Sequence, residues 1–116
     1  MKYLVLTIGL ALIAGCTESQ QVILDPSFST DIQTVFNTNC ITCHGSGTQD
    51  GSYRLDGYAE VLGNGSDSVP NVIPSQADSS LLYDRINVGT MPPTGPLDVM
   101  VIQTVKNWIN KGAQDN

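Results

Sequence analysis

Basic side chains, aromatic rings and histidine are all scarce in this sequence, and each shortage makes some classes of function less plausible. The 116 residues include five Lys and Arg against eleven Asp and Glu, for a formal net charge of −6. Because phosphate backbones are bound by clustered Lys and Arg, this balance argues against nucleic-acid binding. Aromatic residues make up 6% of the chain, which suits a small domain whose core is filled partly by a bound cofactor.

The N-terminal apolar stretch is shorter than the roughly 20 residues that a transmembrane helix needs. It covers residues 3–14, follows the positive charge of Lys2 and ends in small residues, which is the pattern of a secretory signal. Residues 12–16, Leu-Ile-Ala-Gly-Cys, resemble a bacterial lipobox, in which the cysteine is lipidated and becomes the first residue. We therefore expect residues 1–15 to be a lipoprotein signal peptide and Cys16 to carry lipid. The alternative is ordinary cleavage near Ala14, with Cys16 left free.

No internal repeat and no long linker divides the rest of the chain. Removal of residues 1–15 leaves 101 residues (116 − 15 = 101), enough for one domain. We expect residues 16–26 to be a lipid-anchored tether, whose apolar residues 22–24 can lie along the domain, and residues 27–116 to form that domain. Loss of Lys2 leaves four basic residues against eleven acids, so the mature net charge is 4 − 11 = −7. This acidity serves either solubility or steering toward a basic partner.

Two of the three cysteines belong to the motif Cys-Ile-Thr-Cys-His at residues 40–44. In an exported protein this motif indicates covalent attachment of c-type haem through Cys40 and Cys43, with His44 as an iron ligand. A disulfide between the two cysteines is the competing interpretation in an oxidising compartment. A thioredoxin-like pair would need a βαβ pattern, which is not visible. Zinc is poorly supplied with ligands because His44 is the only histidine.

A second axial ligand for the iron must come from a residue other than histidine. Of the three methionines, Met1 is lost with the signal peptide, and Met100 lies beside a predicted apolar stripe, where core packing is the common role. Met91 lies in a proline-stiffened loop, 47 residues after His44 (91 − 44 = 47). A thioether favours Fe(II) and raises the reduction potential. We expect Met91 to be the second ligand; the alternative is a buried gap-filling side chain.

Apolar periodicity predicts about four short helices. The first should begin near Ser29 or Thr30, bury Ile32 and Phe36, and end at the cysteine motif. The others are expected at residues 59–62, at residues 79–86 after the cap Asp78, and between the cap Asp98 and the stop Gly112. The stripe of the last helix should pack inward; it consists of Val101, Ile102, Val105, Trp108 and Ile109.

From about Ser27 onward the chain resembles a small bacterial monohaem cytochrome c domain of the His/Met-ligated, lipoprotein type. The resemblance is carried in order by Asp31-Ile32-Gln33 to Phe36, Cys40-x-x-Cys43-His44, Arg54-Leu55-Asp56-x-Tyr58, Ile73-Pro74 with Ser79-x-Leu81-Leu82-Tyr83, Met91-Pro92-Pro93, and Trp108-Ile109-x-x-Gly112-Ala113. It implies an all-α cytochrome c fold of about four short helices around one covalently bound haem. It also implies His44 as proximal ligand, Met91 as distal ligand and single-electron transfer.

The resemblance further implies that the first and last helices cross near one haem edge, with Phe36 and Trp108 as aromatic contacts between them. The sequence departs from the pattern at Ser75, where relatives often have Gly, and at Ile32, which is bulkier than the usual residue at the crossing. Suitable donors for the haem propionates are carried by Arg54, Tyr58, Arg85 and Trp108. For the two arginines, a solvated surface role is the alternative.

The expected function is a membrane-tethered electron carrier that is not itself an enzyme but can serve an oxidoreductase as redox partner or subunit, and no small-molecule substrate is identified. Its partners would be redox proteins with a basic docking surface, and lipid on Cys16 would hold it in the bacterial cell envelope, facing the periplasm or the cell surface. Thr17 is not the Asp that retains many lipoproteins at the inner membrane, which favours the outer membrane. One alternative is a haem enzyme subunit or a gas or redox sensor with a labile distal ligand. Another is a thiol redox or binding module without haem.

Overall fold

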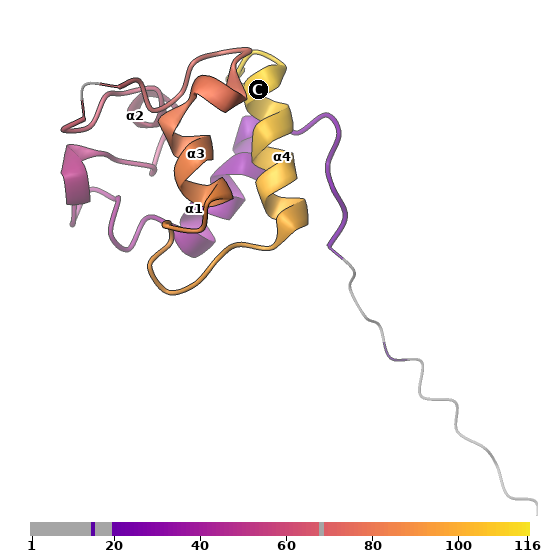
Figure 1. Cartoon of the computed structure of the whole chain (residues 1–116), viewed down its shortest axis with the longest axis horizontal. Coiled ribbons are helices and arrows are strands. Elements are labelled where there is room, and N and C mark those ends of the chain that lie inside the picture. Colours follow the sequence, from indigo (N-terminus) through magenta and orange to yellow (C-terminus); the bar gives the residue numbers. More distant parts are fainter. Residues whose placement is uncertain (1–14, 16–19, 68) are drawn as a thin grey trace, which may run out of the picture.

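The computed structural model describes residue 15, residues 20–67 and residues 69–116. Most of the expected signal peptide and the lipidation candidate Cys16 therefore lie outside the described residues. The described part is built from helices and loops (Figure 1), in the order η1 (Phe28–Ile32), α1 (Gln33–Asn39), η2 (Asp50–Ser52), α2 (Tyr58–Val61), η3 (Ala77–Ser79), α3 (Leu81–Asn87) and α4 (Val99–Asn110). It contains four α-helices and no strand, which is compatible with an all-α, cytochrome c-like fold.

None of the helices within the described ranges is both long and apolar enough to cross a membrane.

The first helical segment continues directly from η1, which has π-helical hydrogen bonds, into α1. It begins earlier than expected from Ser29 or Thr30, because Ser27 is its cap. The Ser27 hydroxyl accepts a hydrogen bond from the Thr30 backbone N–H (3.3 Å), and the Asp31 carboxylate accepts one from the Ser27 backbone N–H (2.8 Å). This reciprocal pairing satisfies donors that a helix start leaves free.

The last helix, α4, begins and ends as predicted. The Asp98 carboxylate accepts a hydrogen bond from the Met100 backbone N–H (2.7 Å), and Gly112 follows the helix with φ of +107°, a conformation that favours glycine. Three members of the predicted stripe are buried, namely Val105, Trp108 and Ile109, whereas the other two are half-buried. The prediction that Met100 packs in the core is wrong, because its side chain is 40% exposed.

The first and last helical segments pack together through η1 and α4. The ring that lies against Trp108 belongs to Phe28, with ring centroids 5.5 Å apart. Phe36, which the resemblance placed in this contact, is two turns further along and is buried in the same core. Ile32 is fully buried between these two positions, so the crossing accommodates the bulky side chain.

The third helix begins later than predicted, and Asp78 does not cap it. Asp78 belongs to the short turn η3, and α3 starts after Ser80. The Asp78 carboxylate instead pairs with Lys106 of α4 at 3.1 Å, and the Lys106 ammonium also lies 5.1 Å from the centre of the Tyr83 ring. Hydrogen bonding to Asp78, followed by the contact with Tyr83, raises the pKa of Lys106. Asp78 therefore joins α4 to the start of α3.

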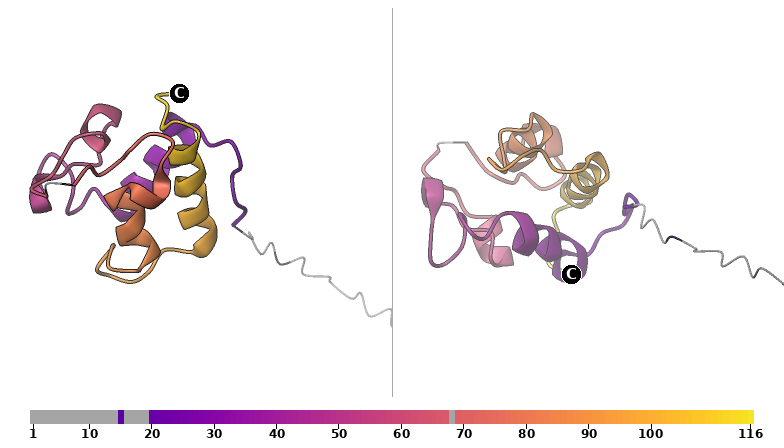
Figure 2. Two further views of the ribbon diagram at one scale, coloured as in Figure 1. Left: turned by 45° about the horizontal axis from the view of Figure 1, so that its top comes forward. Right: turned by 90° about the horizontal axis from the view of Figure 1, so that it is seen from below.

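Residues 20–26 form an arm along α4 (Figures 1 and 2). The Ile23 backbone N–H donates to the Thr104 hydroxyl (3.1 Å), and the Asn107 amide donates to the Ile23 carbonyl (3.0 Å). Lys111 pairs with Asp25 at 2.9 Å. The domain thus begins with an ordered segment that is fixed to the outside of the last helix.

Candidate cofactor site

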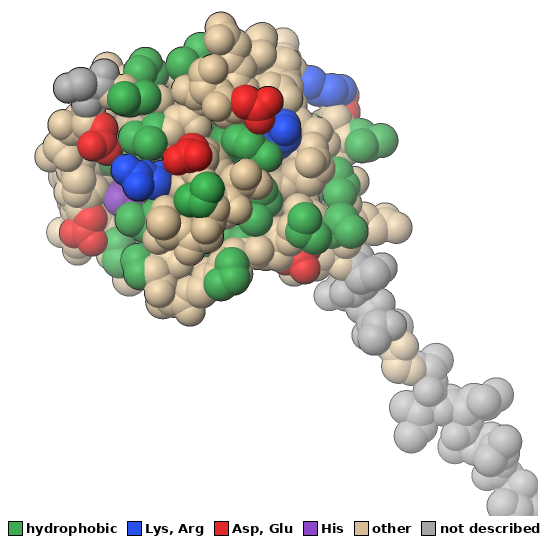
Figure 3. All heavy atoms as spheres, viewed as in Figure 1, with side chains coloured by type: hydrophobic (Ala, Val, Ile, Leu, Met, Phe, Trp, Pro, Cys, Tyr) green, Lys and Arg blue, Asp and Glu red, His purple; other side chains and the backbone are tan. Residues whose placement is uncertain are grey.

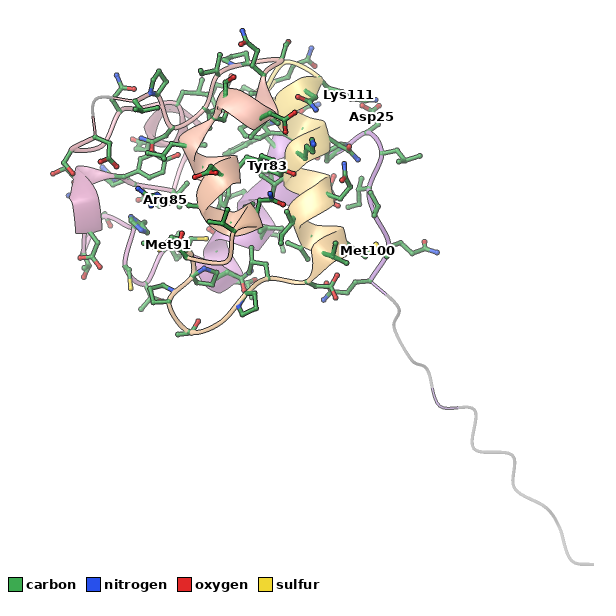
Figure 4. The ribbon with its side chains drawn as sticks, in the orientation of Figure 1. Asp25, Tyr83, Arg85, Met91, Met100 and Lys111 are labelled. Atoms are coloured by element: carbon green, nitrogen blue, oxygen red, sulfur yellow. The ribbon has the colours of Figure 1, made fainter. Side chains whose placement is uncertain are left out.

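A cavity of about 590 Å³ lies between the cysteine motif, α3 and the loop that carries Met91. This volume is within the range of about 300–1,000 Å³ typical of ligand pockets. The cavity wall brings together Cys40, Cys43, His44 and Met91, although Met91 is far from the others in the sequence. We call residues 40–55 the His44 wall and residues 88–95 the Met91 loop. Figure 4 shows Met91 and Arg85 on the side of α3 that faces this cavity.

The two motif cysteines lie in a tight turn at the end of α1. The turn is closed by hydrogen bonds from the backbone N–H groups of Cys43 and His44 to the Cys40 carbonyl (3.2 and 2.9 Å). Both thiols are half-buried and free, so the disulfide considered from the sequence is not formed. Burial, followed by the nearby Cys43, raises the pKa of the Cys40 thiol to about 11. A thiol redox centre needs a lowered cysteine pKa, so this environment disfavours the thioredoxin-like alternative.

His44 is oriented by hydrogen bonds on both its ring and its backbone. Its Nδ1 lies 3.0 Å from the Tyr53 carbonyl oxygen. Because a carbonyl only accepts, Nδ1 carries the proton, and Nε2 keeps its lone pair for a metal. The His44 carbonyl in turn accepts a hydrogen bond from the Leu55 backbone N–H at 2.7 Å. The imidazole is therefore held in the tautomer that iron ligation requires.

Tyr53 is a site residue that the sequence reasoning did not find. Its ring lies edge-on to the His44 ring, with centroids 6.0 Å apart, and its buried hydroxyl donates to the Val61 carbonyl at 2.7 Å. Burial, followed by the charge of Cys40, raises the pKa of this hydroxyl. Tyr53 stays a neutral donor and ties the His44 wall to α2. The sequence offers no signal for this role, since any residue has the carbonyl that His44 uses.

The Met91 loop is attached to the end of α3 through one oxygen atom. The Arg85 carbonyl lies within 3.1 Å of the backbone N–H groups of Thr90 and Met91 and within 3.2 Å of the Thr90 hydroxyl, all three of which donate to it. Gly89 has φ of +80° and allows the sharp reversal between helix and loop. Met91 itself is half-buried and packs against the core while lining the cavity.

Among the four propionate candidates, the structure brings only Arg85 to the cavity wall. The Arg54 guanidinium makes a two-point contact with the Asp56 carboxylate (2.9 and 2.6 Å), and this hydrogen bonding raises the pKa of Arg54 and lowers that of Asp56. The Tyr58 hydroxyl donates to the Ala113 carbonyl (2.7 Å), and the Trp108 indole N–H donates to the Gln114 carbonyl (3.0 Å). These three side chains thus have protein partners away from the cavity.

The residues around the cavity fit a covalently attached haem. Two free thiols lie one helical turn apart, and the imidazole beside them has its Nε2 available. Apolar side chains of Leu55, Leu82 and Ile86 complete much of the wall. Such a wall suits a porphyrin face, and the thioether of Met91 adds a soft donor for iron.

Comparison with known families agrees with this geometry. Residues 40–95 match a family model described as Planctomycete cytochrome C. The matched segment begins at the first thiol, includes His44 and Met91, and ends with the Met91 loop. Fold, site and match together support a cytochrome c-like domain, and the match suggests a haem-binding electron-transfer protein with covalently bound haem c. No curated protein and no solved structure matched the chain.

Proposed function

We propose that this protein is a single-electron carrier with one haem c, held between His44 and Met91 and tethered by lipid on Cys16 to the bacterial cell envelope. The observation that carries the proposal is the cavity shared by both motif thiols, the oriented imidazole and the Met91 thioether. When bound, haem c supplies an iron that changes between Fe(III) and Fe(II) by one electron.

Each wall of the cavity has its own task in this proposal. Cys40 and Cys43 would hold the porphyrin by thioether bonds, and His44 would offer Nε2 to the iron. The hydrogen bond from Nδ1 to the Tyr53 carbonyl keeps the imidazole oriented and increases its basicity. The Met91 thioether would favour the reduced iron, and the apolar side chains of the wall would limit access of water to it.

A haem enzyme or a gas sensor with a labile distal ligand is the less supported alternative. Catalysis at a distal site needs an acid–base group, and the only histidine of the sequence is used on the proximal side. The Met91 loop is also fastened to α3 by three hydrogen bonds to one carbonyl. These features favour a Met91 loop that would stay closed over the cofactor and would supply Met91 as its ligand.

The ligand assignment is tested by replacing Met91 in the holoprotein. We expect a low-spin spectrum with the weak far-red sulfur-to-iron band, and complete loss of that band in Met91→Ala. Met100→Ala is the matched control, because Met100 is exposed on α4 and outside the cavity. A high-spin oxidised protein, or a band that survives in Met91→Ala, would show that Met91 is not the ligand.

The proposed location depends on Cys16, which would carry lipid and face the periplasm or the cell surface. Thr17 favours the outer membrane, and the acidic mature chain favours redox partners with a basic surface. Intact mass spectrometry of the mature protein tests both attachments. The expected mass is that of a chain beginning at Cys16 with lipid and one haem, and a mass without haem would exclude the electron-carrier function.

A further inference from the structure

Four of the six exposed large apolar side chains among the described residues belong to the arm and to the start of α4, the helix along which the arm lies. Ile23 and Leu24 of the arm are 38% and 74% exposed, and Val99 and Met100 of α4 are 67% and 40% exposed. We call these four residues the arm patch. The other exposed large apolar residues, Val69 and Val88, belong to separate loops.

Hydrogen bonds fix the arm to the helix that carries the other half of the arm patch. The Ile23 backbone N–H donates to the Thr104 hydroxyl (3.1 Å), and that hydroxyl donates to the Met100 carbonyl (2.9 Å). Figure 4 shows Met100 at the start of α4, close to the point where the arm begins. Figure 3 shows hydrophobic side chains at the surface on this side of the molecule. The patch is therefore a fixed part of the domain surface.

The arm patch is close in sequence to the residue proposed to carry lipid. The chain advances seven residues from Cys16 to Ile23 (23 − 16 = 7), and it can span about 25 Å at most over that length. A lipid on Cys16 therefore keeps the patch within that distance of the bilayer surface. We propose that the arm patch rests on the bilayer itself, with its apolar side chains in the interfacial layer. This inference depends on the lipid anchor of the proposed function.

Charge around the patch indicates an apolar contact and not attraction to anionic headgroups. Asp25 is paired with Lys111 at 2.9 Å, and the Asp98 carboxylate is engaged as the cap of α4. The mature chain is acidic, with a net charge of 4 − 11 = −7, so anionic lipid would repel the domain as a whole. A zwitterionic bilayer is therefore the appropriate surface.

Contact at the arm patch would orient the cofactor site. Met91 and Arg85 lie on the other side of α3 and α4 from the arm (Figure 4), and the loops of the His44 wall lie further away from it (Figures 1 and 2). A domain that rests on its arm patch thus turns the cavity away from the bilayer. The haem plane would then have one fixed angle to the membrane.

Linear dichroism of the haem absorption measures that angle directly. The lipidated holoprotein is incorporated into phosphatidylcholine vesicles, which are aligned by flow. We expect a clear dichroic signal for the wild type and at least a fivefold loss in the double variant Leu24→Ser, Val99→Ser. The matched control is Val69→Ser, which removes a half-exposed apolar side chain (50%) outside both the arm patch and the Met91 loop and should keep the signal. An unchanged far-red band checks that each variant is folded around its haem.

The outcomes separate this inference from the function on which it rests. Vesicle-bound holoprotein without dichroism, or with the same dichroism in the Leu24 and Val99 variant, would overturn the inference and leave the electron carrier intact. A signal that disappears when the protein-to-lipid ratio is lowered would assign the patch to a second copy of the chain and also overturn it. If the protein does not bind vesicles, both the proposed lipid anchor and this inference are wrong. If the mature protein contains no haem, the proposed function is wrong.

Discussion

His44 and Met91 line the same cavity, but the chain holds them in different ways. The His44 ring is fixed through its own nitrogen, and the bond connects residues only nine positions apart. The Met91 side chain makes no hydrogen bond of this kind; it packs against the core, and its backbone N–H bonds to the Arg85 carbonyl at the end of α3. The comparison teaches that the position of the His44 ring is set by local folding, whereas the position of Met91 depends on how the loop closes. Local opening should therefore begin at Met91.

The largest effect is expected on the His44 wall, in Tyr53→Phe. The change leaves the buried Val61 carbonyl without its donor, which should lower the free energy of unfolding by about 1–3 kcal/mol. Unfolding of the holoprotein in guanidinium chloride measures this loss of free energy. Tyr83→Phe is the matched control: the Tyr83 hydroxyl makes a long contact of 3.4 Å with Asn87, and phenylalanine keeps the ring that lies against Lys106, so this change should cost less. Equal losses in the two variants would mean that Tyr53 does not tie this wall to α2.

A smaller and more selective effect is expected in the Met91 loop, in Thr90→Val. The variant loses one of three hydrogen bonds to the Arg85 carbonyl, worth about 1 kcal/mol, so the population with an open distal site should rise about fivefold. The rate of CO binding to the reduced holoprotein reports that population. Thr34→Val removes a similar hydroxyl-to-carbonyl bond on α1, outside the cavity, and should leave the rate unchanged. If both variants bind CO equally fast, the loop is not the weaker side.

The smallest effect concerns acid and the Arg54–Asp56 pair, which flanks Leu55 on the His44 wall. Hydrogen bonding to Arg54 lowers the pKa of Asp56 in the folded state. The unfolded chain therefore binds the proton more readily, so the contribution of this carboxylate is present above its unfolded pKa of about 3.9 and is lost as pH falls further. We expect the Tm of Arg54→Gln to decrease slightly less steeply below pH 4 than the Tm of the wild type. Lys111→Gln, which removes an ion pair near the arm, should retain the wild-type slope.

Much of the fold could be predicted from apolar spacing, and the errors have physical causes. The stripe of α4 and its cap Asp98 follow from periodicity and capping chemistry. The start of the first helix could not be chosen among neighbouring hydroxyl residues, because the choice rests on the reciprocal bonds of Ser27 and Asp31. Met100 was misassigned because periodicity alone does not show where the edge of a buried stripe lies.

The candidate site was predictable where a side chain carries the chemistry and not where the backbone does. The cysteine motif and Met91 could be selected by residue type, and the cavity brings them together. The Tyr53 carbonyl could not be selected, since every residue has one. Of the four propionate candidates, only Arg85 lines the cavity, because the loop path decides which donors meet it. Ser75 shows the reverse case, since its φ of +66° explains why relatives often have Gly there.

The triple hydrogen bond at the Arg85 carbonyl makes α3 and the Met91 loop one mechanical unit. The end of α3 is exposed at Arg85, Asn87 and Val88, where another protein can press on it. A small tilt of that helix would pull or push the loop through a single oxygen atom. The position of the Met91 thioether at the cavity is in this way coupled to the exposed end of α3.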